Sequence, residues 1–156
     1  MKLVDLLPKE SISTELKSRT KNGIIRELLE LLARSSHVRD INAVSESIFE
    51  REHSMSTGIG SGVAIPHGKS SGIVHLCASL GIIKEGVDFN SIDKKPTYIF
   101  FLLAGPEGPP GPHIKALSRI SRMLNKSIFR EKLLQCNTPE EVVKSIEEEE
   151  KDYFEM

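Results

Sequence analysis

The sequence predicts an α/β fold, a mixed β-sheet flanked by helices on both faces. Two observations predict this architecture. Segments in which apolar residues recur at helical spacing lie at both ends of the chain, and short β-rich runs bounded by Gly, Pro, Asn and Asp lie between them. The length of 156 residues suits one compact domain, so we expect residues 1–156 to form a single domain.

Two amphipathic helices are expected near the N-terminus. The first runs from Lys21 to Arg34, where apolar side chains recur on one wide face. These side chains are Ile24, Ile25, Leu28, Leu29, Leu31 and Leu32. The second begins at Asp40, a residue type that caps helices well, and runs toward Arg51. Arg51 is therefore expected at the end of this helix or just beyond it.

Three runs in the middle of the chain predict strands, at residues 62–65, 75–83 and 97–103. The last of them lies within "TYIFFLLA", which is apolar at nearly every position. Such a run is typical of a central strand that is covered on both faces. The Pro/Gly-rich stretch "GPEGPPGP" follows this strand and separates it from the next helical segment.

Further helices are expected after that stretch. One opens at His113 and continues through "HIKALSRISRML", and a short one covers residues 128–134. Thr138, Pro139 and Glu141 then form a capping box with proline at the first helical position, which predicts the start of the last helix.

Composition and charge exclude several classes of protein. The formal net charge of −1 argues against nucleic-acid binding, because phosphate backbones are met by clustered Lys and Arg. No apolar run approaches the ~20 residues of a membrane helix, and the N-terminus lacks the apolar core of a signal peptide. Cys77 and Cys136 lie far apart, which favours the reducing cytosol and disfavours a metal site. We therefore expect a cytoplasmic protein.

The segment "STGIGSGVAIPHGKS" (residues 56–70) carries the first candidate for chemistry. Its alternating glycines allow the backbone to fold tightly and to approach a ligand closely. Pro66 lacks an N–H group and suits the point where strand pairing ends, so His67 is expected to project from a strand end. A lone histidine in this position is more often structural, and the glycines match neither a dinucleotide-binding motif nor a P-loop.

His113 and Arg51 are two further candidates. His113 opens a helix whose unpaired N–H groups and positive dipole end attract an anion and disfavour the imidazolium. Arg51 has a planar guanidinium that matches phosphate oxygens in a bidentate way. The simpler alternatives are an exposed histidine without a role and a surface arginine beside Glu50 and Glu52.

Together these side chains suit phosphoryl transfer. A neutral imidazole can accept a phosphoryl group and pass it on. The transition state spreads negative charge over oxygens that an arginine and a second donor would stabilise. The sequence offers no acidic cluster spaced to hold a metal, so we expect neither a metal nor a cofactor.

The run "RE-x5-GIGSGVAIPHGK" resembles the active-site signature of the enzyme IIA domains of the fructose/mannitol class in the bacterial phosphoenolpyruvate-dependent sugar phosphotransferase system. The nitrogen-branch regulatory IIA proteins belong to the same class. The segments "FFLLAGPEGPPGPHIKALSRISRML" and "TPEEVVKSI" are also typical of it, so the resemblance covers essentially the whole chain. The fold of that class, a mixed sheet with helices on both sides, agrees with the pattern above.

The resemblance implies that His67 is the phosphorylated nucleophile, His113 its partner histidine and Arg51 the residue that orients the phosphoryl group. The predicted phosphoryl loop consists of Thr57, Gly58, Gly60 and Gly62. The implied donor is the histidine phosphocarrier protein, and the implied acceptor is a cysteine on an enzyme IIB domain. Contact with a membrane is expected only through a permease partner.

Three alternatives stay open from the sequence. A regulatory protein of the nitrogen-branch type would use phosphorylation of His67 to switch a protein–protein surface. A metal-dependent hydrolase or binding protein would use His67 and His113 as ligands, but no carboxylates accompany them at ligand spacing. A noncatalytic interaction domain would have no use for either histidine.

Overall fold

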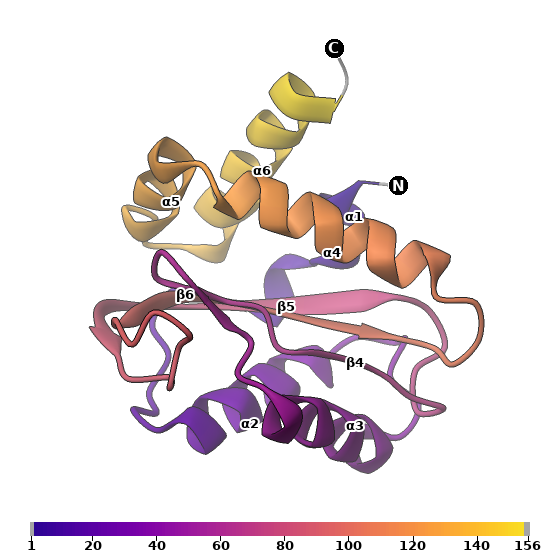
Figure 1. Ribbon diagram of the computed structural model, residues 1–156. Coiled ribbons are helices and arrows are strands. Elements are labelled where there is room, and N and C mark those ends of the chain that lie inside the picture. Colours follow the sequence, from indigo (N-terminus) through magenta and orange to yellow (C-terminus); the bar gives the residue numbers. More distant parts are fainter. Residues whose placement is uncertain (1, 155–156) are drawn as a thin grey trace.

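Six strands form one mixed sheet between two layers of helices in the computed structural model, which describes residues 2–154 (Figure 1). The predicted α/β class is therefore confirmed. The outermost residues of the predicted domain, 1 and 155–156, lie outside the described part.

Two helices cover one face of the sheet: α2 (Lys21–Leu32) and α3 (Ile41–Ser54) (Figure 1). The Asp40 carboxylate accepts hydrogen bonds from the first backbone N–H groups of α3, which are unpaired at every helix start, so the predicted cap is confirmed. Both helices turn their apolar side toward the strands, as the spacing in the sequence predicts.

The opposite face carries the remaining helices. They are α1 (Leu3–Leu6), α4 (Gly111–Leu124), α5 (Ser127–Leu134) and α6 (Pro139–Phe154). Before α6, the Thr138 hydroxyl accepts a hydrogen bond from the Glu141 N–H at 3.2 Å. The Glu141 carboxylate accepts in return from the Asn137 N–H, one residue before the expected partner. The predicted capping box thus forms, with its return bond shifted by one residue.

The sheet has the order β1-β5-β6-β3-β2, and β4 also pairs with β6. The strands are β1 (Ile12–Ser13), β2 (Gly58–Gly60), β3 (Val63–Ala64), β4 (His67–Lys69), β5 (Cys77–Val87) and β6 (Thr97–Gly105). A single 3-10 turn (Lys9–Ser11) precedes β1. Parallel pairs (β3 and β4 with β6, β1 with β5) and antiparallel pairs (β5 with β6, β2 with β3) coexist, which makes the sheet mixed.

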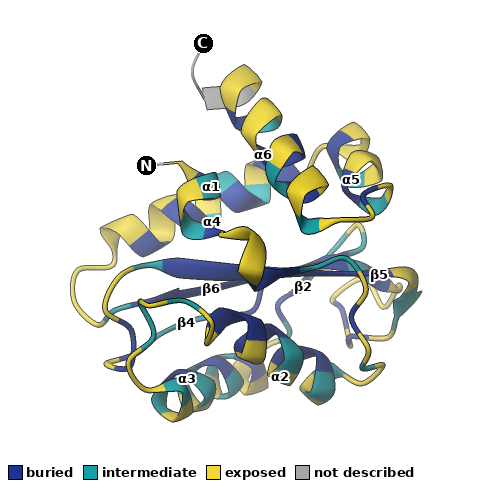
Figure 2. Cartoon of the chain, turned by 180° about the vertical axis from the view of Figure 1, so that it is seen from behind, coloured by how far each residue is buried: buried dark blue, intermediate teal, exposed yellow. Residues whose placement is uncertain are grey.

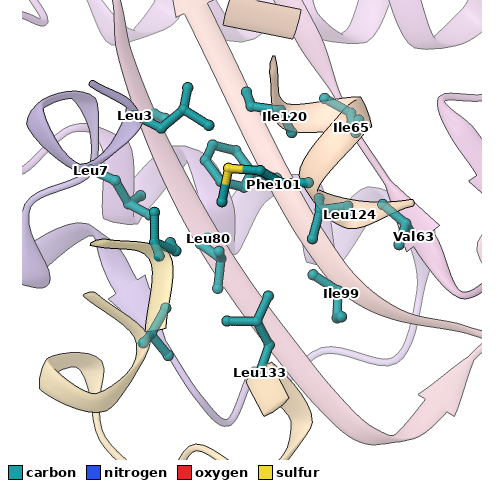
Figure 3. Packing of buried hydrophobic residues seen from close by; sticks show 14 of the residues in the cluster. Leu3, Leu7, Val63, Ile65, Leu80, Ile99, Phe101, Ile120, Leu124 and Leu133 are labelled. Atoms are coloured by element: carbon teal, nitrogen blue, oxygen red, sulfur yellow. The ribbon is translucent and has the colours of Figure 1, made fainter. Parts of the chain in front are cut away.

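Strand β6 lies at the centre of the molecule and is buried along nearly its whole length (Figure 2). Side chains alternate along it, so Phe100 and Leu102 face α2 and α3 while Phe101 and Leu103 face the other helices. Figure 3 shows the second group, in which Phe101 packs beside Ile120 of α4. Burial of one such side chain stabilises the fold by roughly 1.5–3 kcal/mol.

The largest departure from the sequence-based expectation concerns the chain after Ala64. The sequence predicts that pairing ends at Pro66, but the Pro66 carbonyl accepts a hydrogen bond from the Leu103 N–H at 2.9 Å. The chain then continues along β6 as β4, with His67 opposite Leu103. The prediction was wrong because a parallel neighbour can bond to the proline carbonyl and needs no N–H at that position.

Candidate functional site

His67 opens β4, which lies between β6 and helix α3. Gly68 allows the close approach of α3, because a Cβ there would come within 2.7 Å of the Ser47 Oγ. That hydroxyl donates to the Lys69 carbonyl at 2.6 Å and joins the helix to the strand. The packing of α3 on β4 therefore brings the last turn of the helix, with Arg51, beside His67.

The His67 ring is half-buried and has one defined hydrogen bond. Its Nδ1 lies 2.8 Å from the carbonyl oxygen of Ile65. A carbonyl can only accept, so Nδ1 carries the hydrogen and, in the neutral ring, Nε2 holds the free lone pair. The pKa of His67 is lowered, first by burial and further by the nearby Arg51 charge, while the Ile65 carbonyl and Glu52 oppose this effect. The ring is therefore favoured in its neutral form.

His113 lies in the first turn of α4 and is 8% exposed, which contradicts the simpler alternative of an exposed histidine without a role. Its ring packs against Gly105 at the end of β6, where a Cβ would come within 2.9 Å of Nδ1. Nδ1 is buried without a hydrogen-bond partner. Burial, followed by the charges of His67 and Lys69, lowers the pKa of His113 to about 4.

The two histidines lie side by side although they come from different layers of the fold. Their ring centroids are 5.9 Å apart, and the ring planes are inclined by 51°. Both rings border one open pocket with a volume of about 550 Å³, which Arg51 and Lys69 also line. The other lining residues are Ser47, Glu50, Ser54, Gly68 and Leu117. The structure thus brings together the three side chains that the sequence singled out.

Arg51 contributes a positive charge to this pocket from the C-terminal end of α3. One of its terminal nitrogens donates to the Met55 carbonyl at 2.8 Å, just beyond the helix. This hydrogen bond uses one of the five guanidinium N–H donors, so four stay available for other partners. Arg51 can therefore bind an anion in the pocket that it shares with His67.

The residues of the predicted phosphoryl loop, Thr57, Gly58, Gly60 and Gly62, lie outside the pocket of the two histidines. Thr57 is buried and donates from both its N–H and its hydroxyl to the Glu52 carboxylate. Gly60 and Gly62 form the β2–β3 hairpin, where φ values of +98° and +80° favour glycine. The structure therefore explains these residues through the hairpin, because the chain after Gly62 must still pass through β3 before it reaches His67.

Sequence reasoning missed Lys69, the Ile65 carbonyl and Glu52. Lys69 is half-buried in β4, and its Nζ donates to the Gly108 carbonyl at 2.5 Å, which links β4 to the loop before α4. The only signal for Lys69 was its place two residues after His67, on the same side of an extended strand. Backbone acceptors such as the Ile65 carbonyl leave no signal in the sequence at all.

Folding stability is expected to fall as the pH drops from about 6.5 to about 4 because of His113. The unfolded chain binds a proton there near pH 6.5, whereas the native ring does so only near pH 4. We expect a loss on the order of 2 kcal/mol, less than the full shift implies because the ring borders an open pocket. Urea unfolding of wild type and His113→Gln across this range measures it. Equal pH slopes in the two proteins would contradict the expectation.

Comparison with known proteins places the chain in a family. Residues 5–149 match the model described as "Phosphoenolpyruvate-dependent sugar phosphotransferase system, EIIA 2". The chain belongs to this family, so the resemblance read from "AIPH" and the neighbouring residues is confirmed. The fructose-specific EIIABC component of this system in Bacillus subtilis (strain 168) is 35% identical over 151 residues, or 97% of this chain and 24% of that protein. The chain thus spans about a quarter of that relative.

Solved structures agree with this assignment. The nitrogen regulatory protein IIA-Ntr from Neisseria meningitidis has a TM-score of 0.83 at 31% identity, covering 92% of this chain and 97% of that one. Enzyme IIA-mannitol, in a complex with phosphorylated enzyme IIB-mannitol from Escherichia coli, has a TM-score of 0.78 and covers 92% and 99%. Its identity of 20% shows a common fold alone.

Two features are absent from residues 2–154, the part of the chain that the structure describes. No helix in this part of the chain has both the length and the apolarity required to cross a membrane. Among the same residues, His, Cys, Asp and Glu side chains nowhere gather in a group of three or more that could hold a metal ion.

Proposed function

We propose that the protein is a phosphocarrier that accepts a phosphoryl group on Nε2 of His67 and passes it to a cysteine of an enzyme IIB partner. The hydrogen bond from Nδ1 to the Ile65 carbonyl carries this proposal, because it leaves the Nε2 lone pair at the pocket. In the first step the Nε2–P bond forms as the donor's N–P bond breaks. In the second, the thiolate sulfur attacks phosphorus and the Nε2–P bond breaks.

His113 and Arg51 stabilise the charge that develops on the transferred group. The buried Nδ1 of His113 has no acceptor nearby, so the favourable tautomer has its hydrogen on Nε2. From there it donates to a phosphoryl oxygen, while Arg51 binds other oxygens through its planar fork. The lowered pKa of His113, about 4, keeps that ring neutral at physiological pH. Nε2 of His67 thus offers a lone pair, whereas Nε2 of His113 offers a hydrogen.

The proposed donor is the histidine phosphocarrier protein, and the proposed setting is the cytoplasm. The acceptor is suggested by the names of two similar proteins. One is a component that combines EIIA, EIIB and EIIC in a single chain, and the other is a IIA chain in complex with phosphorylated IIB. A membrane would be approached only through the permease partner of such a IIB domain.

A regulatory role is the second candidate. The observation that favours it is the 31% identity to a nitrogen regulatory IIA protein, together with the match in fold. A phosphoryl group on His67 would add negative charge to an open pocket that Leu117 of α4 also lines. The two candidates share the phosphorylation step and differ in the protein that responds to it.

A reconstituted phosphotransfer assay tests the proposal. Phosphoenolpyruvate, enzyme I and the histidine phosphocarrier are mixed with the protein, and intact mass and imidazole ¹⁵N spectra are recorded. We expect one acid-labile phosphoryl group per chain, bonded to Nε2 of His67. Failure of the protein to gain mass while the carrier itself is charged would overturn the proposal. Loss of the group on addition of a IIB domain favours sugar uptake, and retention favours regulation.

A further inference from the structure

An ion pair with a buried carboxylate joins helices α2 and α3, neither of which carries His67 or His113. The Glu52 side chain is 4% exposed, and its Oε2 atom lies 2.7 Å from the Nζ atom of Lys21. Lys21 belongs to the first turn of α2, where its ammonium also lies 5.0 Å from the centre of the Phe89 ring. A buried carboxylate in this setting needs such a counter-charge, because an unpaired one would be costly.

The same carboxylate holds Thr57, the residue just before β2, at two points. The Thr57 N–H donates to Glu52 at 2.8 Å, and the Thr57 hydroxyl donates to its other oxygen at 2.5 Å. With three charge-assisted partners in all, Glu52 leaves Thr57 little freedom to rotate. The direction of the Thr57 carbonyl is thereby set.

Two backbone hydrogen bonds continue from this point to the nucleophile. The Thr57 carbonyl accepts from the Ile65 N–H at 3.0 Å. The Ile65 carbonyl then accepts from Nδ1 of His67 at 2.8 Å. Ile65 therefore links Thr57 to the His67 ring. The Thr57 carbonyl holds the Ile65 N–H, and the Ile65 carbonyl in turn holds the His67 ring.

We propose that Glu52 is a positioning residue for phosphoryl transfer, acting through Thr57 and Ile65 to hold the His67 ring in its reactive tautomer and orientation. This inference rests on the proposed function, in which His67 is the nucleophile. It also gives the neighbouring residues Arg51 and Glu52 separate roles. The two neighbours leave α3 in different directions, so one lines the pocket while the other anchors the hairpin behind it.

The consequence for the reaction is geometric. An attacking nitrogen must be in line with the breaking bond, and a displacement of about 1 Å can cost roughly 100-fold in rate. The wrong tautomer would place the hydrogen on Nε2 and remove the nucleophilic lone pair altogether. Without the Glu52 carboxylate, the Thr57 carbonyl is free to move. The Ile65 carbonyl, which keeps the hydrogen of His67 on Nδ1, is then free to move as well.

The test compares wild type with the double variant Glu52→Gln/Lys21→Met, which leaves no unpaired buried charge. Long-range ¹H–¹⁵N spectra of the unphosphorylated protein report the His67 tautomer directly. We expect wild type to hold its hydrogen on Nδ1 and the double variant to show both tautomers. The rate of phosphorylation at saturating donor should fall roughly 10- to 100-fold, with the KM for the donor unchanged. Glu46→Gln, an exposed change on the same helix, is the matched control.

A second variant keeps the test decisive if the double variant does not fold. Thr57→Val preserves shape and removes only the hydroxyl donor, so a smaller loss in rate and a detectable second tautomer are expected. A folded variant with pure Nδ1–H tautomer and the wild-type rate overturns the positioning role. Absence of phosphorylation in wild type overturns the proposed function instead, while the tautomer spectra still decide the role of Glu52.

Discussion

Replacement of His67 by glutamine is expected to abolish phosphoryl acceptance. Glutamine has a similar reach, but its amide nitrogen has no available lone pair and cannot attack phosphorus. Arg51 and His113 would remain at the pocket with nothing to receive the group. Intact-mass measurement after incubation with the charged donor should find the variant unmodified under conditions in which wild type is fully converted.

A control must separate loss of the nucleophile from loss of the fold. His67 is only half-buried and forms a single hydrogen bond to the backbone, so its replacement should cost about 1 kcal/mol of folding stability. Thermal unfolding checks this value. His75→Gln, a change at an exposed histidine outside the pocket, should accept the group at the wild-type rate. A phosphorylated His67→Gln protein would assign the acceptor atom to another residue.

Replacement of His113 by alanine is expected to slow phosphorylation about 100-fold without lowering the final amount of phosphoprotein. The nucleophile survives, but the transition state loses one preorganised donor, and loss of such a donor typically costs about 10²–10³ in rate. The ring is buried against Gly105, so no other side chain can move into its place without rearrangement. Rapid quenching at saturating donor measures the effect as a change in the maximal rate.

The conservative variant His113→Gln tests whether His113 acts as a hydrogen-bond donor or only packs in the site. Its side-chain amide can present an N–H close to the position of the imidazole Nε2. The rate of His113→Gln should therefore be about ten-fold higher than that of His113→Ala. Ser118→Ala, on the exposed side of the same helix, should leave the rate unchanged. Equal rates for wild type and His113→Ala would show that the partner histidine only packs.

Local chemistry explains why much of the fold could be predicted. Asp40 and Thr138 cap helices through their own side chains, and these contacts span only two or three residues. The run ending at Leu103 was readable as a central strand because both of its faces are buried. Of the short strands around it, the predicted run at residues 62–65 contains β3 (Val63–Ala64), whereas β4 was not predicted. The strand His67–Lys69 is too brief for any periodicity to appear.

Part of the candidate site could likewise be predicted from the sequence, and part could not. His67, His113 and Arg51 could be picked out because each has a side chain with chemistry and stands beside a glycine, a proline or a helix end. The glycines of the predicted phosphoryl loop do not line the pocket of the two histidines. They signal positive φ and close packing, which a hairpin requires as much as a ligand site does.

The order of residues along the chain settles which side chains are available, where the helices begin, and to which family the chain belongs. It does not settle which nitrogen of His67 is free, that His113 is buried, or that Glu52 is tied to Thr57. Those properties depend on backbone carbonyls, on burial and on neighbours from other helices and strands. They arise only when β4 pairs with β6 and α3 packs against it, because hydrogen bonding and desolvation are set by distance in space and not by separation along the chain.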